Sequence, residues 1–376
     1  MREKYCIQCL ALLGEYVEVL GPVLHEKGVD VCLGLLQQNS KHHEPSKVAF
    51  VLPDVMKLIC ALAAHRKFAA LFVDRGGMQK LLAVPRTAQT FFGLSSCLFT
   101  IGSLQVFNIF NCYNRDVRCV IAIILQTFVY IFLVIDLPTM LLHYFDSRFL
   151  FQGIMERVCA LPSDVIYHVV ELALQLIECN QDLARKNAAL FFAAAFVFRA
   201  VLDAFDSQDG LQKLLGLLND AASIRSGVTS GALGSSNSGS LRNDRTSSAE
   251  VLTSSEKQVA YHTCVALRQY FRAHLLVLID SIRPNKSNRS SARNIPSTRA
   301  AYKPLDISNE AMDAVFLQLQ KDRKLGPAFV RTGWREVEKF LASNGHITML
   351  ELCQVCHIYY IVCDPFVLQY IYLPSS

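Results

Sequence analysis

Two short cysteine motifs have spacings known from metal and cofactor sites. Residues 6–9 (CIQC) have the spacing of half a zinc site, and residues 353–357 (CQVCH) have that of a c-type haem attachment site. Cys6 and Cys9 are three residues apart on an apolar helical face, where core packing is the expected role. Haem attachment belongs to an exported compartment, and no secretory signal is recognised. We therefore expect neither a metal nor a cofactor.

The other candidates for chemistry lack the partners that catalysis requires. His262 and Cys264 fall in one predicted helix, and neither has a Ser/Asp or Cys/His partner at a triad-like position. Gly76-Gly77 precedes a helix but lacks the glycine-rich patterns that cradle phosphate. His42-His43 lies in a polar loop, where solvation is the expected role. We predict no catalytic, cofactor-binding or metal-binding residue, and a protein that is not an enzyme.

Positive charge gathers in one part of the chain. The net charge is +5, but residues 221–304 carry 12 Lys/Arg against 4 Asp/Glu. Within that region, Arg283–Lys303 has six basic residues and no acidic one. Such a segment fits nuclear import, a nucleic-acid contact or a solvated serine-rich linker. Because no aromatic residues for base stacking are interleaved, the linker is favoured.

The elements around these motifs form a repeat. Three segments share a register: GVDVCLGLL from Gly28, GMQKLLAVP from Gly77 and GLQKLLGLL from Gly210. The first two glycines are 49 residues apart; the next two are 133 apart, or 86 without residues 106–152, which is two steps of 43. Armadillo and HEAT units repeat at about 40–47 residues. The sequence predicts an all-α armadillo/HEAT-like helical repeat solenoid, interrupted by an apolar insert and disordered linkers.

Apolar spacing predicts individual helices in the first half. Residues 51–64 form one helix, with Pro53 in the first turn, where proline is tolerated. Ser163 is the expected cap of a helix over residues 164–178. Residues 183–205 are apolar nearly all round, which predicts one helix buried between neighbours.

In the second half, the sequence predicts a linker followed by two capped helices. Residues 221–248 are rich in Gly, Ser and Asn and too polar to form a core, so we expect disorder. Residues 253–256 (TSSE) form a capping box that starts a long helix ending near Ile282. Ser308 is the expected cap of the next helix, with Glu310 in its first turn.

Residues 106–152 and 355–376 differ in composition from the rest of the chain. They hold 15 of the 37 aromatic residues but no Gly, Lys or Glu. Each begins with Val directly after Gln, and the codons of these two residues match the bases at an intron boundary. We therefore interpret both stretches as translated intron sequence. The alternative for the first stretch is a membrane span over Cys119–Ile135, whose 17 uncharged residues reach the lower length limit. A buried strand or helix is the third possibility.

Most cysteines outside these two stretches fall on apolar helical faces. Since no secretory signal is recognised, we expect reduced core thiols rather than disulfides. The cysteines concerned are Cys6, Cys9, Cys32, Cys60, Cys97, Cys159, Cys179, Cys264 and Cys353.

Several long strings resemble the plant members of the Vpr-binding protein family. They include LPDVMKLICALAAHRKFAALFVDRGGMQKLLAVPR, ARKNAALFFAAAFVFRAVLDAFD and YKPLDISNEAMDAVFLQLQKDRKLGPAFVR. The resemblance covers residues 1–105 and 153–354. In the family, GSLQ runs directly into GIMER, which locates the insert at residues 106–152, and the sequence after LELCQ differs, which locates the second departure at Val355.

The resemblance implies a function for the intact family protein. That protein is a substrate receptor of cullin-4 RING ubiquitin ligases with an armadillo-like half, a LisH motif and a WD-repeat propeller that contacts the damaged-DNA-binding adaptor. This chain resembles only part of the armadillo-like half, so no adaptor-binding residue carries over. We expect a nuclear scaffold fragment in protein ubiquitination, with no small-molecule ligand and no membrane association. The alternatives are a single-pass membrane protein or a nucleic-acid-associated helical repeat module.

These expectations divide the chain into eight parts. Armadillo-like repeats cover 1–105 and 153–220, separated by the insert at 106–152. A disordered linker at 221–252, a long helix at 253–283, a basic linker at 284–304, a helical segment at 305–354 and a non-family tail at 355–376 follow.

Overall fold

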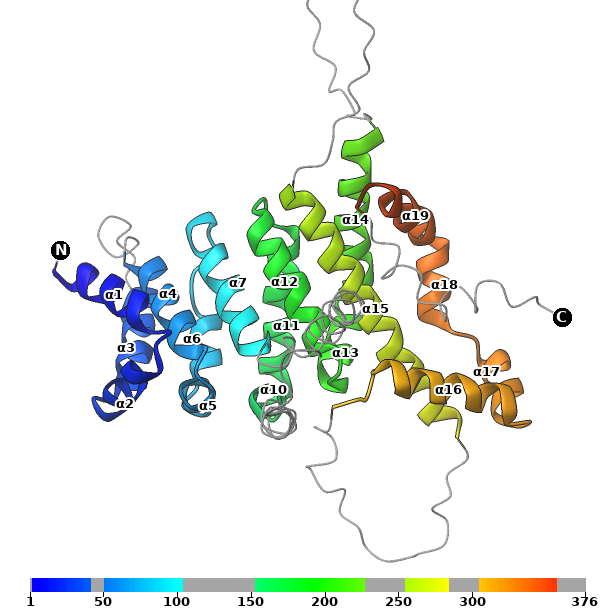
Figure 1. Ribbon diagram of the computed structural model, residues 1–376, viewed down its shortest axis with the longest axis horizontal. Coiled ribbons are helices and arrows are strands. Elements are labelled where there is room, and N and C mark those ends of the chain that lie inside the picture. Colours follow the sequence, from blue (N-terminus) through cyan, green and yellow to red (C-terminus); the bar gives the residue numbers. More distant parts are fainter. Residues whose placement is uncertain (1, 42–50, 104–152, 227–253, 284–303, 357–376) are drawn as a thin grey trace, which may run out of the picture. The chain divides into compact units, whose positions relative to one another are not determined.

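The computed structural model describes residues 2–41, 51–103, 153–226, 254–283 and 304–356 (Figure 1). Every regular element in these ranges is an α-helix, and none is a strand. The predicted all-α helical repeat fold is therefore confirmed. The candidate span Cys119–Ile135, most of both predicted linkers and most of the tail lie outside the described residues.

The chain divides into two compact units. Unit 1 comprises Met1–Gln208 with Lys286–Asp306, and unit 2 comprises Asp209–Asn285 with Ile307–Ser376. The helices of unit 1 are α1 Arg2–Leu13, α2 Val17–His25, α3 Gly28–Lys41, α4 Leu52–Ala63, α5 Arg66–Asp74, α6 Gly77–Leu82, α7 Ala88–Ser103, α10 Gly153–Cys159, α11 Ser163–Glu178, α12 Asp182–Ala195 and α13 Arg199–Asp206. Those of unit 2 are α14 Gly210–Ser226, α15 Ser254–Ile282, α16 Asn309–Lys321, α17 Leu325–Thr332, α18 Arg335–Ala342 and α19 Gly345–Cys356.

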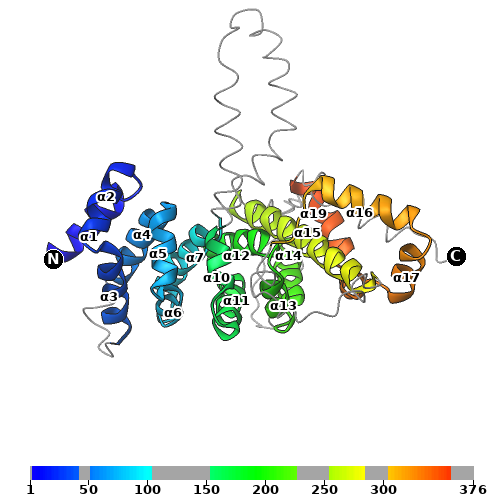
Figure 2. The same cartoon turned by 90° about the horizontal axis from the view of Figure 1, so that it is seen from below.

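Unit 1 is built from three-helix repeats. The repeats are α1-α2-α3, α4-α5-α6 and α7-α10-α11, and α12-α13 continues the series. The first helices α1, α4, α7 and α12 each contact the next, and so do the third helices α3, α6 and α11. Figure 2 shows those third helices along one side of the unit. Each repeat therefore covers its apolar face with the next one.

A left-handed residue followed by glycine starts the third helix of each repeat found from the sequence. Lys27, Gly76 and Asp209 have φ of 56°, 80° and 53°. In unit 2, Asn344 (φ 55°) precedes α19 in the same way, an occurrence that the sequence analysis missed. The backbone N–H groups of Ile347 and Thr348 donate to the Asn344 carbonyl, so this one residue closes one helix and opens the next.

Glycine is required after the left-handed residue because a bulky side chain covers it. A Cβ on Gly77 would lie 2.3 Å from the Phe72 ring, and a Cβ on Gly345 would lie 2.3 Å from the Phe340 ring. Both phenylalanines lie five residues before their glycine and are fully buried. The aromatic ring and the bare backbone thus fix the angle between consecutive helices.

The helices expected in both halves are largely confirmed. Pro53 lies in the first turn of α4, and α15 ends at Ile282. The Ser308 hydroxyl accepts a hydrogen bond from the Ala311 amide at 3.2 Å, with Glu310 in the first turn of α16.

Two predicted helix boundaries are wrong. Pro162, not Ser163, is the N-cap residue of α11, and Ser163 is already helical. The predicted linker begins too early, because α14 continues to Ser226. Ala221 and Ala222 extend its buried face and are themselves buried.

The single helix predicted for residues 183–205 is broken into α12 and α13. The break is at Phe196–Phe198, where Phe196 and Phe198 are both buried. The Val197 carbonyl, released from the helical ladder, accepts a hydrogen bond from the Leu305 amide at 2.7 Å. Because every residue from 188 to 198 is apolar, the pattern gave no sign of the turn.

The first and second helices of the third repeat lie on either side of residues 104–152. Without residues 106–152, α7 and α10 would be separated by two residues, as α4 and α5 are. The Arg157 guanidinium of α10 forms an ion pair with Asp74 of α5, and α10 also contacts α7. The described helices on both sides of the stretch therefore occupy the positions expected of one repeat.

Replacing Gly77 with Ala should lower the free energy of unfolding by about 1–3 kcal/mol, because the new methyl group would overlap the buried Phe72 ring. Gly34→Ala in α3 is the matched control. Nothing lies within 4 Å of its added Cβ, so the change should be neutral or stabilising by up to about 1 kcal/mol. Urea unfolding followed by circular dichroism measures both. Equal midpoints for the two variants would contradict the packing argument.

Deleting residues 106–152 should raise the soluble yield and the thermal unfolding midpoint. The deletion would join α7 to α10 by a two-residue link of ordinary length and would remove 47 residues of apolar composition. Yield after centrifugation and differential scanning fluorimetry measure the effect. Unchanged yield and midpoint would indicate that the stretch belongs in the repeat.

Candidate partner-binding groove

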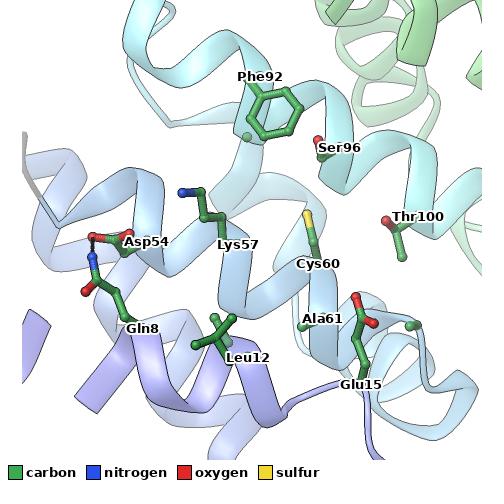
Figure 3. A pocket seen from close by; sticks show the side chains of 13 residues that line it. Gln8, Leu12, Glu15, Asp54, Lys57, Cys60, Ala61, Phe92, Ser96 and Thr100 are labelled. Atoms are coloured by element: carbon green, nitrogen blue, oxygen red, sulfur yellow. Dashed lines mark hydrogen bonds between the residues drawn. The ribbon is translucent and has the colours of Figure 1, made fainter. Parts of the chain in front are cut away.

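A groove of about 560 Å³ lies over α1, α4 and α7, the first helices of three successive repeats of unit 1 (Figure 3). Its lining residues are Gln8, Ala11, Leu12, Glu15, Asp54, Lys57, Cys60, Ala61, Ala64, Phe92, Gly93, Ser96 and Thr100. We call this surface the α1–α4–α7 groove.

Small residues let the three helices approach closely beneath the groove. A Cβ on Gly93 of α7 would lie 2.9 Å from the Met56 Cβ of α4. A Cβ on Gly14, just after α1, would lie 3.0 Å from the Ala61 Cβ. These contacts leave little side-chain bulk between the helix backbones beneath the groove.

The edges carry apolar side chains exposed to solvent. Leu12 on α1 is 79% exposed, and Phe92 on α7 is 38% exposed. Figure 3 shows them on either side of α4. Exposed apolar side chains that flank a concave surface are typical of protein-binding sites. The groove therefore has the apolar anchors that a partner would bury.

Charged groups lie between these anchors. The Asp54 carboxylate is 7% exposed and is compensated, since it accepts a hydrogen bond from the Gln8 amide at 3.1 Å and lies 3.8 Å from the Lys4 ammonium. Lys57 and Glu15 are exposed, and within the described residues neither side chain forms an ion pair or hydrogen bond. One cation and one anion are thus available to a bound partner.

Two thiols meet at the floor. The Cys60 and Cys97 sulfurs are 3.4 Å apart, and the Cys97 thiol also lies 3.6 Å from the Met56 carbonyl oxygen. The hydrogen bond with Cys60, followed by burial, raises the pKa of the Cys97 thiol well above its usual range. Burial likewise raises the pKa of the Cys32 thiol to about 12. Cys97 and Cys32 are therefore neutral thiols at physiological pH.

The prediction of core thiols holds for five cysteines and fails for two. Cys6 and Cys9 are exposed, because α1 presents this face to solvent rather than to a neighbouring helix. The buried cysteines are Cys32, Cys97, Cys159, Cys179 and Cys264.

The other candidates from the sequence do not gather into a site. Gly76-Gly77 forms the turn described above, and Cys264 is buried inside α15. His42-His43 and His357 lie outside the described residues. Across the described ranges, no three His, Cys, Asp or Glu side chains are grouped so as to hold a metal ion. In those same ranges no helix has both the length and the apolar character needed to cross a membrane.

The groove residues themselves were missed by sequence reasoning, although one signal was available. Met56 and Cys60 are four residues apart in α4, and Gly93 and Cys97 are four apart in α7. A spacing of four places each pair on one helical face. Matching those faces would have required knowing that α4 and α7 pack together.

Stacked three-helix repeats define the class of helical-repeat proteins. Residues 1–105 match the Mahjong helical domain family, and residues 260–363 match the DCAF1 helical domain family. The first match ends at the residue before the predicted insert, whereas the second runs past the predicted boundary at Gln354.

Relatives from three organisms resemble the chain. The DDB1- and CUL4-associated factor homolog 1 of Arabidopsis thaliana is 59% identical over 94% of this chain and 16% of its own length. Protein mahjong of Drosophila melanogaster is 24% identical over 91% of this chain and 18% of its own. The Caenorhabditis elegans DDB1- and CUL4-associated factor homolog 1 is 21% identical over 74% of this chain and 12% of its own. The chain thus spans less than a fifth of each relative.

The chain is a partial homologue of the plant Vpr-binding protein, the DDB1- and CUL4-associated factor 1, and the resemblance found in the sequence is confirmed.

Alkaline pH should destabilise the fold through its buried thiols. Burial raises the pKa of Cys32 and Cys159 from 9.0 to about 12, whereas the unfolded chain releases these protons near pH 9. Between pH 9 and 12 the unfolded state binds fewer protons, so the free energy of unfolding falls as pH rises, by at most about 1.4 kcal/mol per pH unit for each thiol.

Cys159→Ala should reduce the slope of the free energy of unfolding against pH, measured by urea titrations from pH 8 to 11. Any loss of packing energy would be the same at every pH and would not change this slope. The exposed Cys9→Ala is the control and should leave the slope unchanged. Identical slopes for the two variants would argue against a raised pKa at Cys159.

Proposed function

We propose that this chain is a non-catalytic protein-binding segment of the substrate receptor of a cullin-4 RING ubiquitin ligase, acting as a scaffold for protein ubiquitination in the nucleus. The 59% identity to the Arabidopsis DDB1- and CUL4-associated factor homolog 1 over 94% of the chain carries this proposal. The repeats support it, because helical-repeat proteins bind partners along extended surfaces rather than in catalytic pockets.

The α1–α4–α7 groove is the proposed surface for partner contact. Leu12 and Phe92 offer apolar anchors on its two sides, which would lose solvent-exposed area on binding. Lys57 and Glu15 lie along the same groove and favour a partner segment that pairs apolar side chains with one acidic and one basic residue.

The adaptor and the cullin are the proposed partners of the intact receptor rather than of this segment. The names of the Arabidopsis and nematode relatives associate them with DDB1 and CUL4, and this chain corresponds to 16% of the Arabidopsis protein. The family resemblance assigns the adaptor contact to a propeller that this chain does not match. The segment would therefore contribute substrate or regulatory contacts.

An affinity-tagged version of this chain should not co-purify with DDB1 from plant extract, whereas the full-length Arabidopsis relative should do so under the same conditions. Quantitative mass spectrometry of the two eluates measures the ratio. Stoichiometric DDB1 on the tagged chain would mean that a second adaptor contact lies within it, and the adaptor-independent role would be withdrawn.

Some proteins are expected to be captured by both the chain and the full-length relative. Phe92→Glu should lower the captured abundance of at least part of this shared set by about tenfold, because a charge replaces an apolar anchor. Tyr167→Glu on α11 is the matched control, since Tyr167 is 42% exposed and lies outside the groove lining. Circular dichroism checks that both variants are folded. Equal losses for the two variants, or no shared proteins at all, would exclude the groove as the contact surface.

A further inference from the structure

Cys60 and Cys97 come from neighbouring repeats and meet beneath the α1–α4–α7 groove. Their sulfurs are 3.4 Å apart, and a disulfide bond of about 2.05 Å would require a closure of about 1.4 Å. The Gly93–Met56 contact, one helical turn before the two cysteines, holds α4 and α7 close together. The fold therefore aligns the two thiols across an interface between repeats.

We propose that Cys60 and Cys97 form an oxidisable dithiol that a hydroperoxide converts into a disulfide joining α4 to α7. This inference rests on the geometry of the two thiols and does not depend on the proposed function.

The two thiols differ in solvent exposure, and this difference determines the role of each in the oxidation. Cys60 is half-buried and lines the groove, so a small oxidant from solvent reaches its sulfur. Cys97 is 0% exposed, and its sulfur lies 3.4 Å from the Cys60 sulfur. Cys60 is accordingly the thiol that is attacked first, and Cys97 is the thiol that resolves the product.

The reaction balances in two steps. The Cys60 sulfur takes one oxygen from hydrogen peroxide, giving a sulfenic acid and one water molecule. The Cys97 sulfur then attacks the Cys60 sulfur; the sulfur–oxygen bond breaks, and the departing hydroxide leaves as water with the Cys97 proton. Overall, two thiols lose two hydrogen atoms and one peroxide is reduced to two water molecules.

The pairing is specific to these two cysteines. Cys32 and Cys159 are buried in the protein and do not line the groove, so no path for the oxidant is evident. Cys6 and Cys9 are exposed on one helix, and a bridge between them would join residues of α1 only. A Cys60–Cys97 bridge would instead link two repeats, which gives it a distinct effect on stability.

The experiment treats the full chain with hydrogen peroxide at pH 7.5, followed by alkylation and digestion without reduction. Tandem mass spectrometry should find a Cys60–Cys97 linked peptide pair, two hydrogen masses lighter than the separate peptides. Alkylation of Cys60 should fall by about tenfold, and the thermal midpoint should rise by roughly 5 °C. Dithiothreitol should reverse all three changes.

Variants distinguish this bridge from other oxidation. A Cys6→Ala/Cys9→Ala chain should still gain the linked pair and the higher midpoint, whereas Cys60→Ala should gain neither. Cys159→Ala, which removes a buried thiol of α10, should behave like the unchanged chain. The linked peptides are detected in the unchanged protein, so the result does not depend on a variant that fails to fold.

Over-oxidation of Cys60 to sulfinic acid without a Cys97 link, in protein that stays folded, would overturn the proposal. So would a bridge confined to Cys6 and Cys9.

Discussion

The close approach of an aromatic ring to a glycine backbone fixes the turn between consecutive helices at two places in the chain. At Phe72 and Gly77, and again at Phe340 and Gly345, the ring fills the space that a side chain would otherwise occupy. The residue between them in the turn adopts positive φ, and its carbonyl starts the next helix. The crossing angle of α5 and α6, and that of α18 and α19, therefore depends on this contact.

Small residues also allow close packing between repeats. Gly93 against Met56 brings two first helices together, and the thiols of Cys60 and Cys97 meet one turn later. Within the α12–α13 pair, by contrast, aromatic rings fill the interior: Phe192, Phe196 and Phe205 have ring centroids 4.8–5.5 Å apart. The groove lies where first helices pack through small residues.

Much of the fold follows from periodicity, whereas the site does not. Apolar spacing and capping residues located several helices, and the glycine register located three of four turns, because these are local properties of the chain. The fourth turn at Asn344-Gly345 was missed because the residues after it, HITMLEL, depart from the leucine pattern of the others. The break at Phe196–Phe198 was hidden by uniform apolarity. The groove and its thiol pair depend on which faces meet in space, and a single sequence does not contain that information.

The hydrogen bond from the Leu305 amide to the Val197 carbonyl makes unit 1 discontinuous along the chain. On the ribosome, the Val197 turn is synthesised roughly one hundred residues before its partner, a delay of about 5–20 seconds at ordinary elongation rates. Until Leu305 emerges, a buried carbonyl at the α12–α13 turn lacks its donor. The last contact of this part of unit 1 to form is therefore at an interior turn.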